Sequence, residues 1–406
     1  MRRVGCLLVV GFLGVVPAVP AYAQPSTSGS TPPEVQCLPA PPNVEPSVPW
    51  AQKQLAPERA WPLTDGAGIT VGVVDTGVDA TVPQLRGQVL PGIDTTKPGH
   101  DPADTDCYGH GTFVAGIIAA TKVDGTGYEG VAPGARILPV RCANTDDPKE
   151  PGALTPEGMA LGIRAAVDEG AQVINVSAST TEQNPALAEA VNYAEQKDVL
   201  IVASAANSAN KGDPVTYPAA YPSVIAVGAV DETGQHAEFS QTGPFVSLVA
   251  PGVDVLGLGP GGPGHWKGSG TSYSAPFVAG VAALVRAYHP NLSAAQVKHR
   301  LLTTANHPAV TLPDPALGWG MVNPLSAVTT VLPEETGAKP NVIMPPAALP
   351  ATAIARDEIG PVLAIAGMIG AVCLALILIL LIRVYRAGRK RGFRPVRVVE
   401  VTTPEN

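Results

Sequence analysis

The sequence predicts an α/β fold, with a doubly wound and mostly parallel sheet flanked by helices, plus one C-terminal transmembrane helix. Short apolar runs rich in β-branched residues, such as 69–74, are typical of strands that are buried on both faces. These runs alternate with segments that carry helix start signals, and the alternation favours right-handed βαβ units. The transmembrane helix is predicted from 360–382, which contains 23 residues and no charge.

The individual elements follow from local signals. Two of the expected helices start at an N-cap residue followed by proline, at Thr155-Pro156 and Asn184-Pro185, and a third starts at the capping box formed by Ser293 and Gln296. We expect strands at 69–74, 136–140, 172–176, 199–203 and 224–228. We expect helices at 111–120, from 155 to the stop signal at Gly170, from 184 onward, near 272–288 and from 293 onward.

The composition excludes several classes of protein. The 406 residues have a formal net charge of −8 and only 15% of them are charged, which excludes a disordered polyelectrolyte. The 43 glycines and 43 prolines exclude a long coiled coil. Because no basic run lies inside the main body of the chain, we expect no nucleic-acid partner.

The two ends predict export and anchoring. Residues 1–23 contain two arginines, an apolar run too short to span a bilayer and a small-x-small site, which together predict a cleaved signal peptide. Seven cations directly follow the predicted span at 360–382. They place the tail, 383–406, in the cytoplasm and the main domain on the other side of the cell membrane, which the chain crosses once.

Proline-rich segments separate the main domain from both ends. Residues 24–48 are rich in Pro, Ser and Thr and predict an extended N-terminal segment, and the Pro/Ala-rich residues 333–359 predict a stalk. The segment between them, 49–332, has no internal repeat, and we expect it to form one domain.

Three reactive side chains lie where the carboxyl ends of strands or the starts of helices are expected. Asp75 follows the strand 69–74, while His110 and Ser272 lie at helix starts in glycine-rich turns. A serine hydroxyl becomes a good nucleophile when a histidine takes its proton, and an aspartate holds that histidine in the right tautomer. Asn207, just beyond the strand 199–203, is expected at the same edge, where it and a helix N-terminus stabilise an oxyanion.

These motifs, in this order, resemble those of the subtilisin-like serine proteases, whose Asp…His…Ser order is a known one. The segments 73–77, 109–112 and 268–276 resemble the three triad motifs, while 49–52 and 318–323 resemble the start and end of the catalytic domain. The added signal peptide, stalk, span and basic tail resemble the mycosins, the membrane-anchored subtilases of type VII secretion systems.

The resemblance implies a membrane-tethered serine endopeptidase that processes a secreted protein or peptide and works with the type VII secretion membrane complex. It implies catalysis by Asp75, His110, Ser272 and Asn207, without a cofactor or a metal. An alternative function is a structural subunit of that complex, in which proteolysis is dispensable. A lipase or esterase is disfavoured, because no Gly-x-Ser-x-Gly elbow surrounds Ser272.

The resemblance also assigns a substrate strand. Ser177, Ala178 and Ser179 resemble the segment to which a peptide substrate adds as an extra strand, although that family usually has glycine at the third position. The family also usually has glycine before the oxyanion asparagine, where this chain has Ala206. A Cβ at this position disfavours the backbone conformation that a glycine adopts easily.

Two further groups of polar residues have no clear pattern. Asp101, Asp104 and Asp106 lack the spacing of a calcium loop, and a solvated acidic loop is the favoured interpretation. The histidines other than His110 lack partners with metal-ligand spacing, and we expect them at the surface: His100, His236, His265, His289, His299 and His307.

Three cysteines fall in the exported part of the chain. Cys37, Cys107 and Cys142 are an odd number without CxxC spacing, so at most one intramolecular disulfide is expected. We favour Cys37–Cys107, which fastens an N-terminal extension that stays attached beside His110, and pairing with Cys142 remains the alternative. Closing a loop of about 70 residues stabilises by roughly 4 kcal/mol in the chain-entropy model.

Overall fold

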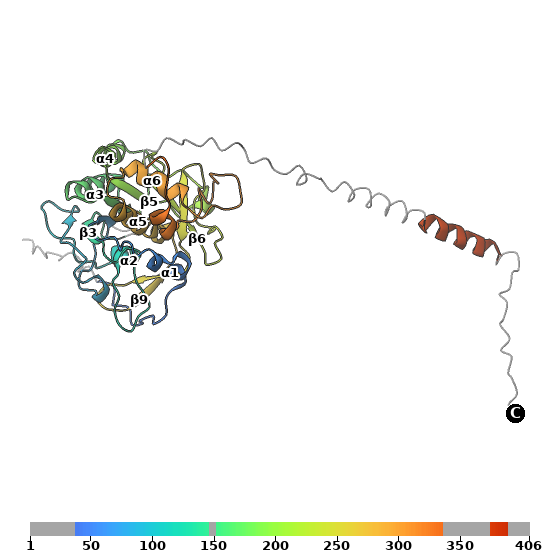
Figure 1. The fold of residues 1–406 in the computed structure, drawn as a ribbon, viewed down its shortest axis with the longest axis horizontal. Helices are drawn as coiled ribbons and strands as arrows, with labels where there is room; N and C mark the ends of the chain where they lie inside the picture. Colours follow the sequence, from blue (N-terminus) through green and yellow to red (C-terminus); the bar gives the residue numbers. More distant parts are fainter. Residues whose placement is uncertain (1–36, 146–151, 336–373, 389–406) are drawn as a thin grey trace, which may run out of the picture. The chain divides into compact units, whose positions relative to one another are not determined.

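The computed structural model describes residues 37–145, 152–335 and 374–388 (Figure 1). The chain forms two units, residues 1–337 and 338–406. In the second unit, residues 374–388 form a helix, which includes the last part of the predicted span. Within the described residues, no helix is long and apolar enough to cross a membrane. The predicted signal peptide, most of the predicted stalk, the first part of the predicted span and most of the predicted tail lie outside the described residues.

A parallel sheet is the centre of the first unit, as the sequence predicted, and it contains seven strands rather than the five expected ones alone. Its spatial order is β2-β3-β1-β4-β5-β6-β7. The strands are β1 Thr70–Asp75, β2 Ile93–Asp94, β3 Arg136–Arg141, β4 Val173–Val176, β5 Leu200–Ser204, β6 Ile225–Val230 and β7 Val246–Pro251. A separate antiparallel hairpin pairs β8 (Val255–Leu258) with β9 (His265–Gly268).

Helices cover both faces of the sheet. The helices are α1 Trp50–Leu55, α2 His110–Ala119, α3 Pro156–Asp168, α4 Pro185–Gln196, α5 Thr271–Tyr288, α6 Ala294–Thr303 and α7 Pro324–Thr329, with 3-10 turns η1 Pro57–Arg59, η2 Pro83–Leu85 and η3 Ala209–Lys211. Figure 1 shows α3 and α4 side by side, and they share one apolar core with Val74 and Ile174. Val71 and Val73 point to the other core, which contains α2 and α5. Alternate residues of β1 therefore serve the two layers.

The five expected strands and the five expected helices are present, each within two residues of its predicted bounds. Thr155 and Asn184 cap their helices through Gly158 N and Leu187 N, and the Ser293 capping box is formed. Local sequence signals did not predict β2, β7, the hairpin, α1 or α7. Pro251 argues against a strand at β7, but β7 is at the edge of the sheet, where proline is tolerated.

The described part of the predicted N-terminal extension, 37–48, has no regular secondary structure and lies against the first unit's loops and hairpin. Leu38 N donates to Cys107 O at 2.9 Å, and His265 N donates to Asn43 O at 2.8 Å. Further along, Gly127 N donates to Glu45 O at 3.2 Å. Residues 37–48 therefore contact the loop before α2, the hairpin and the segment after α2.

A buried ion pair fastens the end of the first unit. Arg300 of α6 is 1% exposed, and its guanidinium donates to Ala327 O at 2.8 Å, to Thr330 O at 2.9 Å and to both carboxylate oxygens of Glu335. Breaking such a pair by removing one partner leaves an uncompensated buried charge.

We expect Arg300→Met to lower the free energy of unfolding of the first unit by about 3 kcal/mol, because the Glu335 carboxylate and two carbonyls lose their donor. Arg164 forms an exposed pair with Glu189 at 3.6 Å, so Arg164→Met is the matched control and should cost less than about 1 kcal/mol. Denaturant unfolding of both variants measures the difference, and equal losses would contradict this role of Arg300.

Candidate functional site

The residues predicted from the sequence meet in one cavity of about 400 Å³ at the carboxyl ends of β1, β4 and β5. In a parallel sheet these ends lie at the same edge, and helices that start there point their N–H groups toward it. The cavity is lined by all seven residues of the predicted catalytic and substrate-binding sets: Asp75, His110, Ser177, Ala178, Ser179, Asn207 and Ser272.

Asp75 and His110 form a buried pair. Asp75 is the last residue of β1 and His110 is the first residue of α2, and they are 6% and 7% exposed. The His110 Nδ1 lies 2.8 Å and 2.9 Å from the two carboxylate oxygens of Asp75. Gly111 permits this approach, because a Cβ there would lie 2.0 Å from Gly77 O and 3.2 Å from the Asp75 Cβ. The contact makes Nδ1–H the donor to the carboxylate, so Nε2 is the ring nitrogen that Asp75 does not use.

Ser272 is the second residue of α5 and is half-buried. Its neighbour Tyr273 packs between the rings of His110 and Phe113, with centroid distances of 5.5 Å and 4.3 Å. Ser177 Oγ donates to the carbonyl oxygen of Ser272 at 2.8 Å. The residue that follows β4 and the helix α2 therefore both contact the first turn of α5.

Asn207 presents its amide nitrogen beside Ser272. The Asn207 Oδ1 accepts from both Thr271 N at 2.8 Å and Thr271 Oγ1 at 2.9 Å, which fixes the orientation of the amide. A Cβ at Gly270 would lie 3.2 Å from Asn207 Nδ2 and 3.0 Å from Ser272 Oγ, so both atoms border the same small space. A hydrogen-bond donor beside a serine hydroxyl is the arrangement of an oxyanion hole.

The backbone before Asn207 is strained. Ala206 has a φ of 84°, which lies in the left-handed region that glycine adopts without a steric cost. Ala206 N donates to Thr271 Oγ1 at 3.0 Å and Ala206 O accepts from Gln241 N at 3.1 Å. These two contacts hold the alanine in the conformation that the Cβ disfavours.

The predicted substrate strand follows β4. Ser177 is buried, Ala178 is half-buried and Ser179 is exposed at the cavity. The hydroxyl of Ser177 is used within the protein, since it contacts Ser272 O and accepts from Asn175 Nδ2 at 2.8 Å. The Ser179 side chain is the most exposed of the three.

Asp106 is buried at the site, although its sequence context predicted a solvated position. The solvated acidic loop is a wrong prediction for this residue, because Asp106 is only 5% exposed, whereas Asp101 is exposed and Asp104 half-buried. Its Oδ1 accepts from Thr76 Oγ1 and Gly109 N, and its Oδ2 accepts from the N–H and hydroxyl of Thr112. Burial raises the pKa of Asp106, and the hydrogen bonds from Gly109 and Thr112 oppose that rise.

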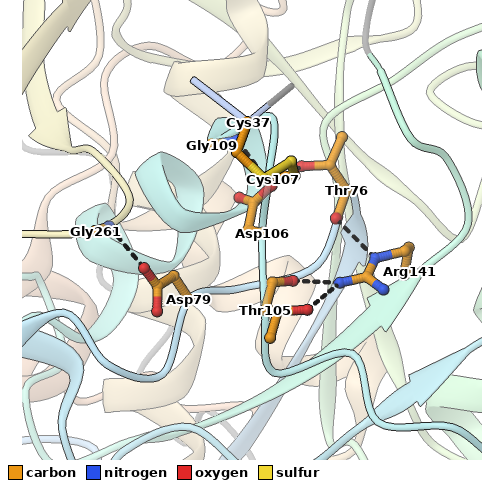
Figure 2. Close-up of a disulfide and its surroundings, with 9 residues drawn as sticks. All are labelled: Cys37, Thr76, Asp79, Thr105, Asp106, Cys107, Gly109, Arg141 and Gly261. Atoms are coloured by element: carbon orange, nitrogen blue, oxygen red, sulfur yellow. Dashed lines mark hydrogen bonds between the residues drawn. A yellow bond between two sulfur atoms is a disulfide. The ribbon is translucent and has the colours of Figure 1, made fainter. Parts of the chain in front are cut away.

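Asp106 therefore links the segment after Asp75 to the first turn of α2. Thr76 Oγ1 donates to Asp106 and also accepts from Gly111 N at 3.0 Å. Figure 2 shows Arg141 on the other side of Thr76, where its Nε donates to Thr76 O at 3.1 Å and its Nη2 donates to Thr105. The only sequence signal for this role is the position of Asp106, four residues before His110.

The structure joins Cys37 to Cys107 in a disulfide, which is the pairing that we favoured (Figure 2). Among the described cysteines, Cys142 is the unpaired one, and burial raises its pKa. The bridge places the N-terminal extension one residue from Asp106.

The predicted surface placement of the histidines is right for His100, His299 and His307, which are exposed. It is wrong for His265, which is 7% exposed, and His236 and His289 are half-buried. The His265 Nδ1 accepts from Glu45 N at 3.1 Å, and burial lowers the pKa of His265. In the described part of the chain, no group of three or more His, Cys, Asp or Glu side chains is arranged to hold a metal ion.

Comparisons with known proteins agree with this geometry. A thermophilic serine proteinase of Bacillus sp. (strain AK1) is 43% identical over 230 residues, which cover 56% of this chain and 55% of that protein. Mycosin-1 of Mycolicibacterium smegmatis is 31% identical over 406 residues, covering 82% of this chain and 88% of that protein. The solved structure of the MycP3 protease from the type VII (ESX-3) secretion system has a TM-score of 0.63 and 36% identity, covering 73% of this chain and 93% of that chain.

The family match is broader than any single motif. The profile of the Subtilase family matches residues 66–320. This range includes β1, α2 and α5, together with every residue that lines the cavity. This match covers more than half of the chain, and the chain therefore belongs to the subtilase family of serine endopeptidases.

Proposed function

We propose that this protein is a membrane-tethered endopeptidase of a type VII secretion system, in which Asp75, His110 and Ser272 form the catalytic triad. The observation that carries the proposal is the buried contact of His110 Nδ1 with Asp75 at 2.8 Å, in a cavity that Ser272 and Asn207 also line. A histidine held in this way has its second nitrogen ready to exchange a proton with a serine.

The chemistry proceeds through an acyl-enzyme. Ser272 Oγ attacks the carbonyl carbon of the scissile peptide bond while its proton moves to His110 Nε2. Asn207 Nδ2–H and Ser272 N–H donate to the oxyanion that forms. His110 then gives the proton to the leaving amine as the peptide bond breaks. A water molecule repeats the sequence on the acyl-enzyme, which releases the second product and regenerates the Ser272 hydroxyl.

Asp75 acts through His110. Its carboxylate holds the imidazole in the tautomer with a proton on Nδ1, and it stabilises the imidazolium that forms during each step. Thr76 N also donates to the Asp75 carboxylate at 2.8 Å.

The substrate is a protein or peptide in an extended conformation. The segment 177–179 continues β4 at the wall of the cavity, so a peptide that pairs with it adds a strand and brings its scissile bond to Ser272. The exposed Ser179 side chain lies in the place of the usual glycine and narrows the space for a substrate side chain.

The membrane tether and the secretion system rest on the sequence and the relatives. The uncharged segment 360–382 and the cations after it support a single span, with the catalytic domain outside and the tail in the cytoplasm. The resemblance to mycosins, and to a MycP3 protease from a type VII secretion system, supports the processing of a secreted substrate beside that membrane complex.

We expect a fluorophosphonate probe to label the wild-type protein at Ser272, because the probe reacts with a serine that a histidine activates. Ser272→Ala should abolish the labelling. Ser269→Ala is the matched control, since Ser269 is exposed and hydrogen-bonds only to Asp254 among the described contacts. Peptide mapping of the adduct to any other serine would contradict the assignment of the nucleophile.

Genetic complementation separates proteolysis from a purely structural role. In a deletion strain, we expect Ser272→Ala to assemble a normal secretion complex and to lose processing of the secreted substrate, because only the nucleophile is missing. The wild-type gene is the control. Loss of secretion with normal complex assembly would favour proteolysis, whereas full restoration of secretion by Ser272→Ala would favour the structural subunit.

A further inference from the structure

The second turn of α5 contains a proline at a position that matters for the nucleophile. In an α-helix, the N–H of residue i donates to the carbonyl of residue i−4. The residue four positions after Ser272 is Pro276, which lies inside the helix and has no N–H. The carbonyl of Ser272 therefore has no helical donor.

Ser177 supplies the missing hydrogen bond from 95 residues away in the sequence. Its Oγ donates to Ser272 O at 2.8 Å, from the residue that directly follows β4. A strand end and a helix start are thus joined through the backbone of the proposed nucleophile. Ser177 is buried, and so water does not compete freely for this contact.

The orientation of the Ser177 hydroxyl is itself fixed. Asn175 Nδ2 donates to Ser177 Oγ at 2.8 Å, so the hydroxyl proton is directed to Ser272 O. Asn175 is fully buried in β4, and its Cα pairs in register with Val73 of β1 and Val202 of β5. The three residues form a chain of hydrogen bonds from the centre of the sheet to Ser272.

We propose that Ser177 is a positioning residue, whose hydroxyl replaces the helical hydrogen bond that Pro276 cannot make and thereby fixes the backbone of Ser272. This inference rests on the proposed triad. The backbone of Ser272 carries the N–H proposed as an oxyanion donor and the Cα from which the attacking hydroxyl extends, so a shift of this residue moves both groups relative to His110 and Asn207. Ser177 thus acts on catalysis through Ser272, in addition to any contact that its backbone makes with substrate.

A positioning role and a substrate-binding role differ in their kinetics. Loss of an uncharged contact with bound substrate raises KM, whereas misplacement of the nucleophile lowers kcat. A displacement of about 1 Å in a reacting group is enough to cost about a hundredfold in rate. The structure also offers a direct rescue, because replacing Pro276 restores an N–H that can donate to Ser272 O.

The test measures kcat and KM of the full chain on a peptide substrate. Titration to completion with a fluorophosphonate gives the concentration of reactive sites, and kcat is expressed per reactive site. We expect Ser177→Ala to lower kcat by about ten- to a hundredfold and to change KM by less than about threefold. In the double variant Ser177→Ala/Pro276→Ala, we expect kcat to return to within about fivefold of the wild-type value, because the helical hydrogen bond replaces the lost one.

A second pair of variants keeps the test decisive if the double variant does not fold. Ser177→Thr keeps the hydroxyl and should retain most of kcat, whereas Ser177→Cys keeps the size, has only a weak donor and should behave like Ser177→Ala. Ser269→Ala, at the surface near the start of α5, is the control for loss of a hydroxyl.

Two results would overturn the inference. The first is a wild-type kcat per titrated site for Ser177→Ala, and the second is a rise in KM without a fall in kcat. A folded double variant that recovers no activity would also count against it. If the wild-type protein itself fails to react with the probe at Ser272, the proposed triad fails, which is a different outcome from failure of the Ser177 inference alone.

Discussion

The site depends on how closely the first turn of α2 approaches the end of β1. Asp75 is buried there, and a buried carboxylate requires donors. His110 Nδ1 and Thr76 N supply them, and Gly111 leaves the space that the contact needs. Asp106 joins the same two segments, because it accepts from Thr76, which follows β1, and from Gly109 and Thr112 at the start of α2. The disulfide at Cys107 fastens the same loop to the N-terminal extension.

The nucleophile side of the cavity is built on different contacts. Thr271 orients the Asn207 amide with two hydrogen bonds and also accepts from Ala206 N. An alanine at a φ of 84° is therefore tolerated, because its neighbours over-determine the backbone there. The Ser177 hydroxyl completes this side through the carbonyl of Ser272. Different hydrogen bonds thus hold the two halves of the site, and Tyr273 of α5 joins the halves by packing against His110 and Phe113 of α2.

Local signals in the sequence were sufficient for much of the fold. The apolar runs, the caps at Thr155, Asn184 and Ser293, and the βαβ alternation depend on neighbouring residues, and they predicted the elements within two residues. The triad motifs predicted which side chains share a cavity. Asp106 and His265 were misjudged, because their burial depends on packing between segments far apart in sequence, such as Glu45 against His265. The hydroxyl role of Ser177 was missed for the same reason, since its partner is 95 residues away.

Ser272, His110 and Asn207 are proposed to act together on one substrate carbonyl group, and a crystal structure with a peptide boronic acid tests this most directly. We expect a covalent bond from Ser272 Oγ to boron, with one boronate oxygen within about 3 Å of Asn207 Nδ2 and another within hydrogen-bond reach of His110 Nε2. A boronate bound to another serine, or bound to Ser272 with Asn207 Nδ2 beyond hydrogen-bond reach, would contradict the proposed site.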